Sequence, residues 1–113
     1  MVKAFSKYDR RFYDRDGNEL SSADELERLL CDKSYKVLKQ ETIGDLRVST
    51  VWLGVDHGFV PGLKPVIFET MIFGGGKHHL DGELWRYSSE EEALEGHKNA
   101  VKMVLAYQEA NDE

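Results

Sequence analysis

Apolar and polar residues alternate through the middle of the chain in the pattern that β-strands produce. One alternating block covers residues 35–42, stops at Gly44-Asp45 and resumes over 46–55, and another extends from Pro65 to Phe73. Alternation with a period of two places successive side chains on opposite faces of a sheet, and glycine beside aspartate favours a tight turn. The pattern predicts a long β-hairpin and a third long strand, followed by a short strand over 83–87.

A smaller hairpin and a helix are predicted before these strands. Asp16-Gly17 lies within residues 11–20 and provides the residue types that a tight hairpin turn requires. Ser22 lies three residues before Glu25, a spacing that allows both side chains to bond free backbone N–H groups at a helix start. Apolar residues at helical spacing then predict a helix of about ten residues.

A second helix is predicted at the end of the chain. Either Ser88 with Glu91 or Ser89 with Glu92 supplies the same capping pair. The apolar stripe expected to face the core consists of Ala93, Leu94, Ala100, Val101, Val104 and Leu105.

The order of these elements predicts an α+β fold. It reads hairpin, helix, hairpin, strand, strand, helix, so we expect an antiparallel sheet of about four to six strands packed with two α-helices. We expect residues 1–113 to form a single domain in which residues 1–10 are a flexible basic N-terminal arm. The segment Gly74–Gly82 has no hydrophobic period and predicts a mobile loop.

Both faces of the central strands are largely apolar, and this raises the question of what covers them. In the strand over 65–73, Phe68 and Ile72 share one face while Met71 and Phe73 share the other. Two helices could cover one face each. If both helices lie on one face, the other face becomes an apolar patch rimmed by charge, which is typical of a partner or self-association surface. The pattern does not decide between these arrangements.

Two ionisable residues lie in apolar surroundings. Glu69 interrupts an apolar strand face, and His97 lies within the stripe of the last helix beside Gly96. A buried carboxylate or imidazole needs a partner, so a Glu69–His97 pair is one hypothesis, either as a structural hydrogen-bonded pair or as an acid/base couple. Arg86 is a second candidate partner for Glu69.

Other side chains suit binding rather than catalysis. Trp52, Arg86 and Tyr87 are of the types that dominate protein interfaces, and they are equally compatible with a small anionic ligand. We therefore take as candidate ligand- or partner-binding residues the set Trp52, Asp56, His57, Glu69, Arg86, Tyr87 and His97.

A metal site would have to combine the two loops that flank the third strand. If these loops met at one end of the sheet, they would bring together Asp56, His57, His78, His79 and Asp81. The spacing matches no established zinc or iron pattern, so we expect no metal and no cofactor. No motif for nucleophilic catalysis is present, and a non-catalytic protein is favoured.

Charge and composition limit the partners. The chain of 113 residues has 15 Lys and Arg against 21 Asp and Glu, a formal net charge of -6, which argues against nonspecific nucleic-acid binding. No apolar run has the length of a membrane span, and no signal-peptide core follows Met1, so we expect a cytoplasmic protein that binds no membrane. The single cysteine, Cys31, excludes an internal disulfide.

Three stretches resemble an uncharacterised family of small proteins encoded by bacteriophages and prophages. They are Val48–His57 (VSTVWLGVDH), Phe68–Gly75 (FETMIFGG), and Arg86-Tyr87 followed by Glu91-Glu92-Ala93 and Gly96-His97. The resemblance implies an accessory protein in the cytoplasm of a bacterial host. By analogy, small acidic phage proteins resemble inhibitors of host defence.

These observations leave several hypotheses of function. The leading one is a non-catalytic binding module that docks a host protein or a second copy of itself through a sheet face or the acidic last helix. The alternative is a pocket for a small polar or nucleotide-like ligand around Glu69, Arg86 and His97, and a metal-dependent hydrolase is the third.

Overall fold

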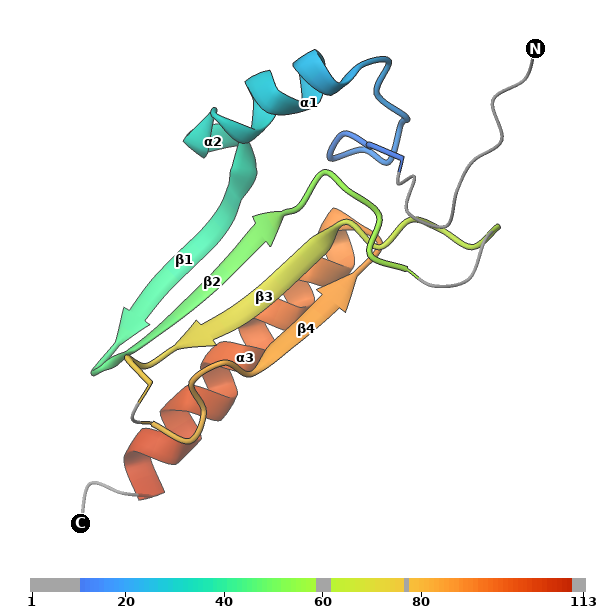
Figure 1. Cartoon of the computed structure of the whole chain (residues 1–113). Coiled ribbons are helices and arrows are strands. Elements are labelled where there is room, and N and C mark those ends of the chain that lie inside the picture. The colour runs from blue at the N-terminus through green and yellow to red at the C-terminus, as the bar shows by residue number, and fades with distance from the viewer. Residues whose placement is uncertain (1–10, 59–61, 77, 111–113) are drawn as a thin grey trace.

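The computed structural model describes residues 11–58, 62–76 and 78–110. It contains helices α1 (Ala23–Leu30), α2 (Lys33–Lys36) and α3 (Glu90–Ala110) and strands β1 (Val37–Ile43), β2 (Leu46–Trp52), β3 (Phe68–Phe73) and β4 (Leu84–Tyr87). The strands form one open antiparallel sheet in the order β1-β2-β3-β4 (Figure 1). The expected α+β fold with an antiparallel sheet is confirmed, with one short helix more than expected. The predicted basic arm over residues 1–10 lies outside the described residues.

Both predicted capping pairs begin helices. The Ser22 hydroxyl accepts a hydrogen bond from the backbone N–H of Glu25 at the start of α1. At the start of α3, Ser89 and Glu92 each accept from the other's backbone N–H, over 3.1 Å in both cases. Of the two candidate pairs for the last helix, the structure uses Ser89 with Glu92.

The short hairpin over 11–20 forms as isolated bridges rather than as strands of the main sheet. Tyr13 pairs with Glu19 across a turn in which Gly17 has a φ of 87°, a conformation that favours glycine. Phe12 pairs with Val55 beyond the end of β2. The hairpin is thereby attached to the end of the sheet where β2 finishes.

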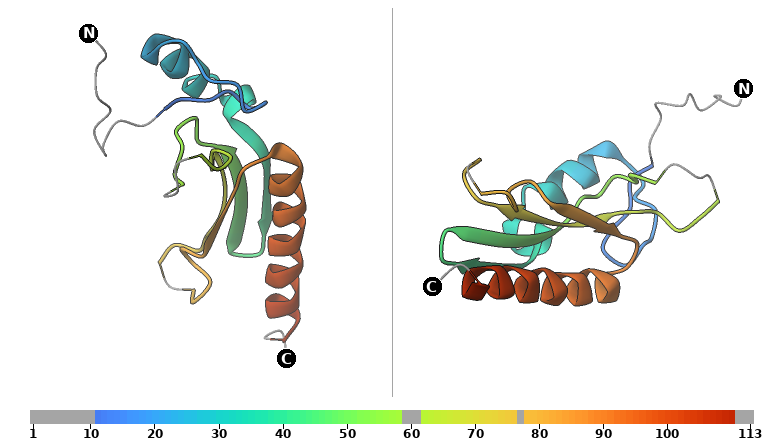
Figure 2. Two further views of the ribbon diagram at one scale, coloured as in Figure 1. Left: turned by 90° about the vertical axis from the view of Figure 1, so that its right-hand side faces the viewer. Right: turned by 90° about the horizontal axis from the view of Figure 1, so that it is seen from below.

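One helix alone covers a face of the sheet. In Figure 2, α3 runs along one side of the four strands, while α1 lies beyond the end of the sheet. The structure therefore matches neither arrangement considered from the sequence. The two predicted helices neither cover one face each nor lie together on one face, because α1 packs beyond the end of the sheet.

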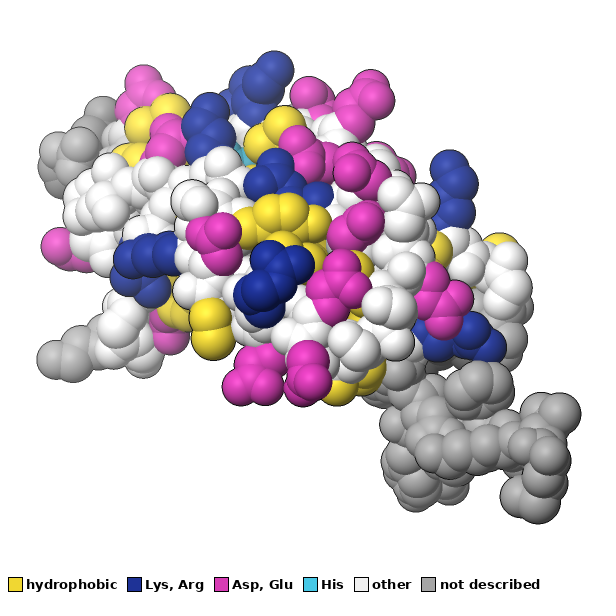
Figure 3. Space-filling view, turned by 90° about the horizontal axis from the view of Figure 1, so that it is seen from above, with side chains coloured by type: hydrophobic (Ala, Val, Ile, Leu, Met, Phe, Trp, Pro, Cys, Tyr) yellow, Lys and Arg dark blue, Asp and Glu magenta, His cyan; other side chains and the backbone are white. Residues whose placement is uncertain are grey.

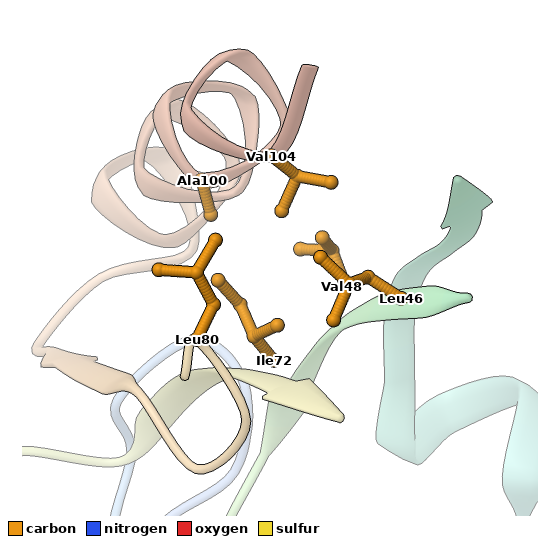
Figure 4. Packing of buried hydrophobic residues seen from close by; sticks show 6 residues of the cluster. All are labelled: Leu46, Val48, Ile72, Leu80, Ala100 and Val104. Atoms are coloured by element: carbon orange, nitrogen blue, oxygen red, sulfur yellow. The ribbon is translucent and has the colours of Figure 1, made fainter. Parts of the chain in front are cut away.

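A small apolar core lies between α3 and the sheet. Its buried side chains come from β2, β3, α3 and the loop before β4, and they point toward one another (Figure 4): Leu46, Val48, Ile72, Leu80, Ala100 and Val104. Leu80 anchors a loop that the sequence pattern predicts to be mobile. A single apolar residue in a glycine-rich loop carries no periodicity, so the pattern gave no sign of this contact.

The buried stripe of α3 is narrower than expected. Ala93, His97, Ala100 and Val104 are buried, at the three- and four-residue spacing of one helix face. Leu94 and Leu105, which were expected in the stripe, are 41% and 50% exposed. Each lies one residue beyond a buried position, and one residue turns the side chain by about 100° around the helix axis.

The first long strand begins later than predicted. Asp32 accepts hydrogen bonds from the backbone N–H groups of Ser34 and Tyr35, and this cap turns residues 33–36 into α2. Further along β1, the register shifts between Val37 and Lys39, so Leu38 forms a β-bulge. The extra residue reverses which side chains of β1 face α3, because alternation restarts after it.

Candidate functional site

A chain of four polar side chains crosses the interface between the sheet and α3. The hydroxyls of Thr50 and Thr70, on adjacent strands, are 2.6 Å apart. Thr50 Oγ1 is 2.7 Å from His97 Nδ1, and His97 Nε2 is 2.9 Å from Glu41 Oε1. Thr50 is fully buried and His97 is 1% exposed, whereas the Glu41 side chain reaches the surface.

The hydrogen bonds of this chain have a consistent direction. A carboxylate only accepts, so in the neutral imidazole Nε2 donates to Glu41 and Nδ1 accepts from the Thr50 hydroxyl. Thr50 then accepts from Thr70. Each buried polar atom thus has a partner, as burial requires.

Hydroxyl, imidazole and carboxylate in series is also the order of a nucleophilic triad, yet burial excludes that role here. A nucleophile must touch its substrate, and the Thr50 hydroxyl lies beneath α3 with no exposed surface. The chain of hydrogen bonds therefore positions α3 on the sheet.

The β-bulge and a glycine explain why these groups meet. Because Leu38 is inserted, Glu41 pairs with Val48 on the face toward α3. Gly96, next to His97, lies against the ring of Tyr87, and a Cβ at that position would overlap the ring. The missing side chain lets α3 approach β4 closely enough for His97 to reach the strands.

The hypothesis of a Glu69–His97 pair is wrong. Glu69 lies between two buried neighbours that face α3, so its own side chain is on the opposite face of the sheet. There its carboxylate receives a hydrogen bond from Nε of Arg86 over 3.0 Å, and the two residues are cross-strand partners. The alternative prediction, an Arg86–Glu69 pair, is confirmed. His97 does not share a pocket with these two residues.

The face opposite α3, here called the open face, carries an apolar centre with charged ends. Met71 and Leu84 are direct partners in the middle of it, and Val51 and Phe73 lie beside them. Phe73 and Leu84 are each 38% exposed. The Glu69–Arg86 pair lies at one end, and Arg47 stacks over the Phe73 ring at the other, 4.7 Å from its centroid.

Two of the predicted interface residues are turned inward. Trp52 is fully buried, its ring edge packs on Tyr35 and its Nε1–H donates to the Tyr13 carbonyl over 3.0 Å. Tyr87 faces α3 and packs against Gly96. Trp52 therefore belongs to the core and offers no surface to a partner. Its burial depends on the hairpin over 11–20, which is distant in sequence.

Asp56 has a structural role in the loop after β2. Its Oδ1 accepts hydrogen bonds from the backbone N–H groups of Gly58 and Val66, each over 2.8 Å, and this joins the two arms of the loop. Burial raises the pKa of the Tyr13 phenol above its usual value of 10.0, and the charges of Glu19 and Asp56 raise it further. The adjacent His57 lines a surface cavity together with Arg86.

The metal site considered from the sequence does not assemble. The loops before and after β3 lie at opposite ends of the sheet, because each flanks a different end of the same strand (Figure 1). Asp56 and His57 are thus separated from His78, His79 and Asp81 by the length of β3. Over 11–58, 62–76 and 78–110, no three metal-binding side chains form a group.

The sequence pattern did not identify Glu41, Thr50 or Thr70 as members of the hydrogen-bonded chain that includes His97. Nothing in the pattern pointed to Glu41 as the partner of His97, because the β-bulge that turns it toward α3 has no sequence signal. The alternation in β3 did place Met71 and Phe73 on one face.

The surface seen in Figure 3 carries side chains of both charges. At the end of the molecule where α1 and α2 lie, basic and acidic side chains are interspersed around small apolar areas (Figure 3). Among the described helices, none combines the length and the apolar character needed to cross a bilayer.

Comparisons of this chain with protein-family models, with curated proteins and with solved structures found no match.

Proposed function

We propose that the protein is a non-catalytic binding module whose open face docks an amphipathic helix of a partner protein. The observation that carries this proposal is that, within the described residues, a helix packs on one face of the sheet and not on the other. α3 covers one face of the sheet, and none of the described helices or strands lies over the other (Figures 1 and 2). The buried position of the Thr50 hydroxyl supports a non-catalytic role.

The open face has the composition of a docking surface. Met71, Phe73 and Leu84 form its centre, and a contiguous apolar area of this kind is usually covered in a soluble domain or used for binding. The charged side chains are confined to its ends, as in interfaces with an apolar core and a polar rim.

The size of the face favours one helix as the occupant. Four strands spaced at 4.7–4.9 Å and about six residues long present an area of about 20 by 20 Å, or about 400 Å². A stable dimer needs about 800 Å² from each partner, about twice this area. The same sheet is covered by one helix on its opposite face, so a single helix is the occupant that fits.

The charges favour acidic residues on that helix. Arg47 lies at one end of the open face, and Arg86 lies at the other end with its partner Glu69, which is the acidic side chain among the described strand residues of this face. The face is therefore net positive on a chain whose formal charge is -6. The resemblance to phage-encoded proteins favours a bacterial host protein as the source of the helix.

Two synthetic helices would test the proposal. Both carry one leucine stripe, and one has glutamate at its flanking positions while the other has lysine. We expect the glutamate helix to bind at micromolar concentration, the lysine helix to bind at least about tenfold more weakly, and Met71→Glu to abolish binding. Isothermal titration calorimetry measures each case.

Leu105→Glu is the matched control, because Leu105 is an exposed leucine on α3, away from the open face. It should leave the affinity unchanged. Absence of binding by either helix, or binding that Met71→Glu leaves intact, would reject the proposal. A stable micromolar dimer that Met71→Glu dissociates would make a second copy of the chain the occupant instead, which analytical ultracentrifugation would detect.

A further inference from the structure

A surface cavity lies between the loop after β2 and the junction of β4 with α3. Its volume is about 640 Å³, within the range of about 300–1,000 Å³ that is usual for small-molecule sites. The residues that line it are His57, Gly58, Leu63, Lys64, Val66, Arg86 and Ser88.

The lining is cationic in an acidic protein. Lys64 and Arg86 contribute positive charges and His57 an imidazole, while none of the described lining residues is acidic. Within the part of the chain that the structure describes, Lys64 has no ion-pair partner. A chain with a formal charge of -6 thus concentrates basic groups at one hollow, which favours an anionic ligand.

Glu69 holds the Arg86 side chain through Nε, and the terminal nitrogens of the guanidinium can bind a ligand. Glu69 accepts from Nε, and this bond leaves the two terminal nitrogens of the guanidinium as donors. Such a fork suits both oxygens of a carboxylate or phosphate. Glu69 is therefore a positioning residue for Arg86.

Hydrogen bonds hold the base of the loop that carries part of the cavity lining. Asp56 bonds the backbone N–H groups of Gly58 and Val66, and the His57 N–H donates to the Val66 carbonyl over 2.9 Å. These bonds join the two arms of the loop that carry His57 and Lys64. A preformed site loses less freedom when its ligand binds.

The geometry points to a binding site for a small organic anion with an aliphatic body. The head group, a carboxylate or a phosphate ester, would lie between Lys64 and Arg86, and the aliphatic part would cover Leu63 and Val66. Most of the exposed lining is apolar, and the described residues that line the cavity include aliphatic Leu63 and Val66. This site shares Arg86 with the open face, but its other lining residues lie in the loop after β2 and at the junction of β4 with α3.

Titration followed by amide NMR tests the site. Octanoate and octyl phosphate serve as probes, and octyltrimethylammonium, which has the same chain with a cationic head, and acetate, which is a head without a body, serve as comparisons. We expect the two octyl anions to shift the amides of His57 and Ser88 at submillimolar concentration, and the comparison compounds to bind at least about tenfold more weakly.

Two variants test whether octanoate binds in the cavity. Lys64→Gln should weaken octanoate binding at least about tenfold, since Lys64 is exposed in a loop and its replacement leaves the fold intact. Arg47→Gln, the matched control at the distant end of the sheet, should leave binding unchanged. Lack of shifts, equal shifts with octyltrimethylammonium, or an unchanged affinity in Lys64→Gln would overturn the inference. Met71→Glu, which tests the open face, should not affect octanoate, so the two proposals fail independently.

Discussion

His97 is bonded at both ring nitrogens, and these bonds make it a tie between α3 and two strands. Its partners Thr50 and Glu41 come from β2 and β1, and Thr70 extends the chain to β3. Buried polar groups stabilise a fold when every member has a partner and destabilise it when one is removed. The orientation of α3 on the sheet thus depends on individual hydroxyl groups.

Removal of one hydroxyl should expose this dependence. Thr50→Val keeps the shape of the side chain but leaves Thr70 and His97 Nδ1 without their shared partner, so we expect a loss of about 2–3 kcal/mol in the free energy of unfolding. Thr42→Val, at an exposed position of β1, should change it by less than about 0.5 kcal/mol. Urea denaturation compares the two variants. Equal stabilities would mean that the buried chain contributes nothing.

The carboxyl group of Asp32 gives a pH-dependent contribution. Its hydrogen bond with the Ser34 side chain, with further bonds from the backbone of Tyr35 and Ser34, lowers its pKa below 3.8. A group with a lowered pKa in the folded state stabilises the fold above its unfolded value and loses this effect as the pH falls through the folded value.

Asp32→Asn should therefore be less stable than the parent chain at neutral pH, and the difference should shrink well below pH 3.8. Urea denaturation at the two pH values measures this change. Asp24→Asn, at another exposed acid, is the control. A stability difference between Asp32→Asn and the parent chain that stays constant with pH would contradict the assigned role of the carboxylate.

The contact of α3 with β4 is the clearest constraint at the level of elements. Gly96 lies within a helix, where alanine would ordinarily add about 1 kcal/mol of stability. Here the added methyl group would overlap the Tyr87 ring, so the helix would have to move away from β4.

We expect Gly96→Ala to lower the free energy of unfolding by about 1–2 kcal/mol, because overpacking outweighs helix propensity. In a Tyr87→Ala background the same change should become stabilising. Asn99→Ala, at an exposed position of α3, reports the propensity effect alone. Thermal or urea denaturation of the four variants suffices, and a stabilising Gly96→Ala in the parent chain would contradict the close contact.

Local signals predicted the elements better than their assembly. Ser22 with Glu25 and Ser89 with Glu92 are caps that act within one turn, and both helices begin where these pairs place them. The partner of His97 depended on a β-bulge at Leu38 and on cross-strand register, which involve residues far apart in the sequence. The pattern also could not show that α1 lies beyond the sheet, because an amphipathic helix reveals an apolar face without revealing what it packs on.

At the scale of the molecule, one sheet has two unlike faces. The face toward α3 is closed by an apolar cluster around Val48 and Ile72, and the open face keeps Met71, Phe73 and Leu84 at the surface. Two layers suffice to fold the domain, and under the proposed function another molecule supplies a third layer. The proposed function and the shape of the fold follow from the same asymmetry.

The accessibility of single methyl groups in the free monomer tests this asymmetry most directly. NMR spectra recorded with a soluble paramagnetic probe compare Leu84, on the open face, with Leu46, beneath α3. We expect strong broadening of the Leu84 methyls, little effect on Leu46, and protection of Leu84 when the glutamate helix is added. Leu84 methyls as protected as those of Leu46 in the free monomer would contradict the account.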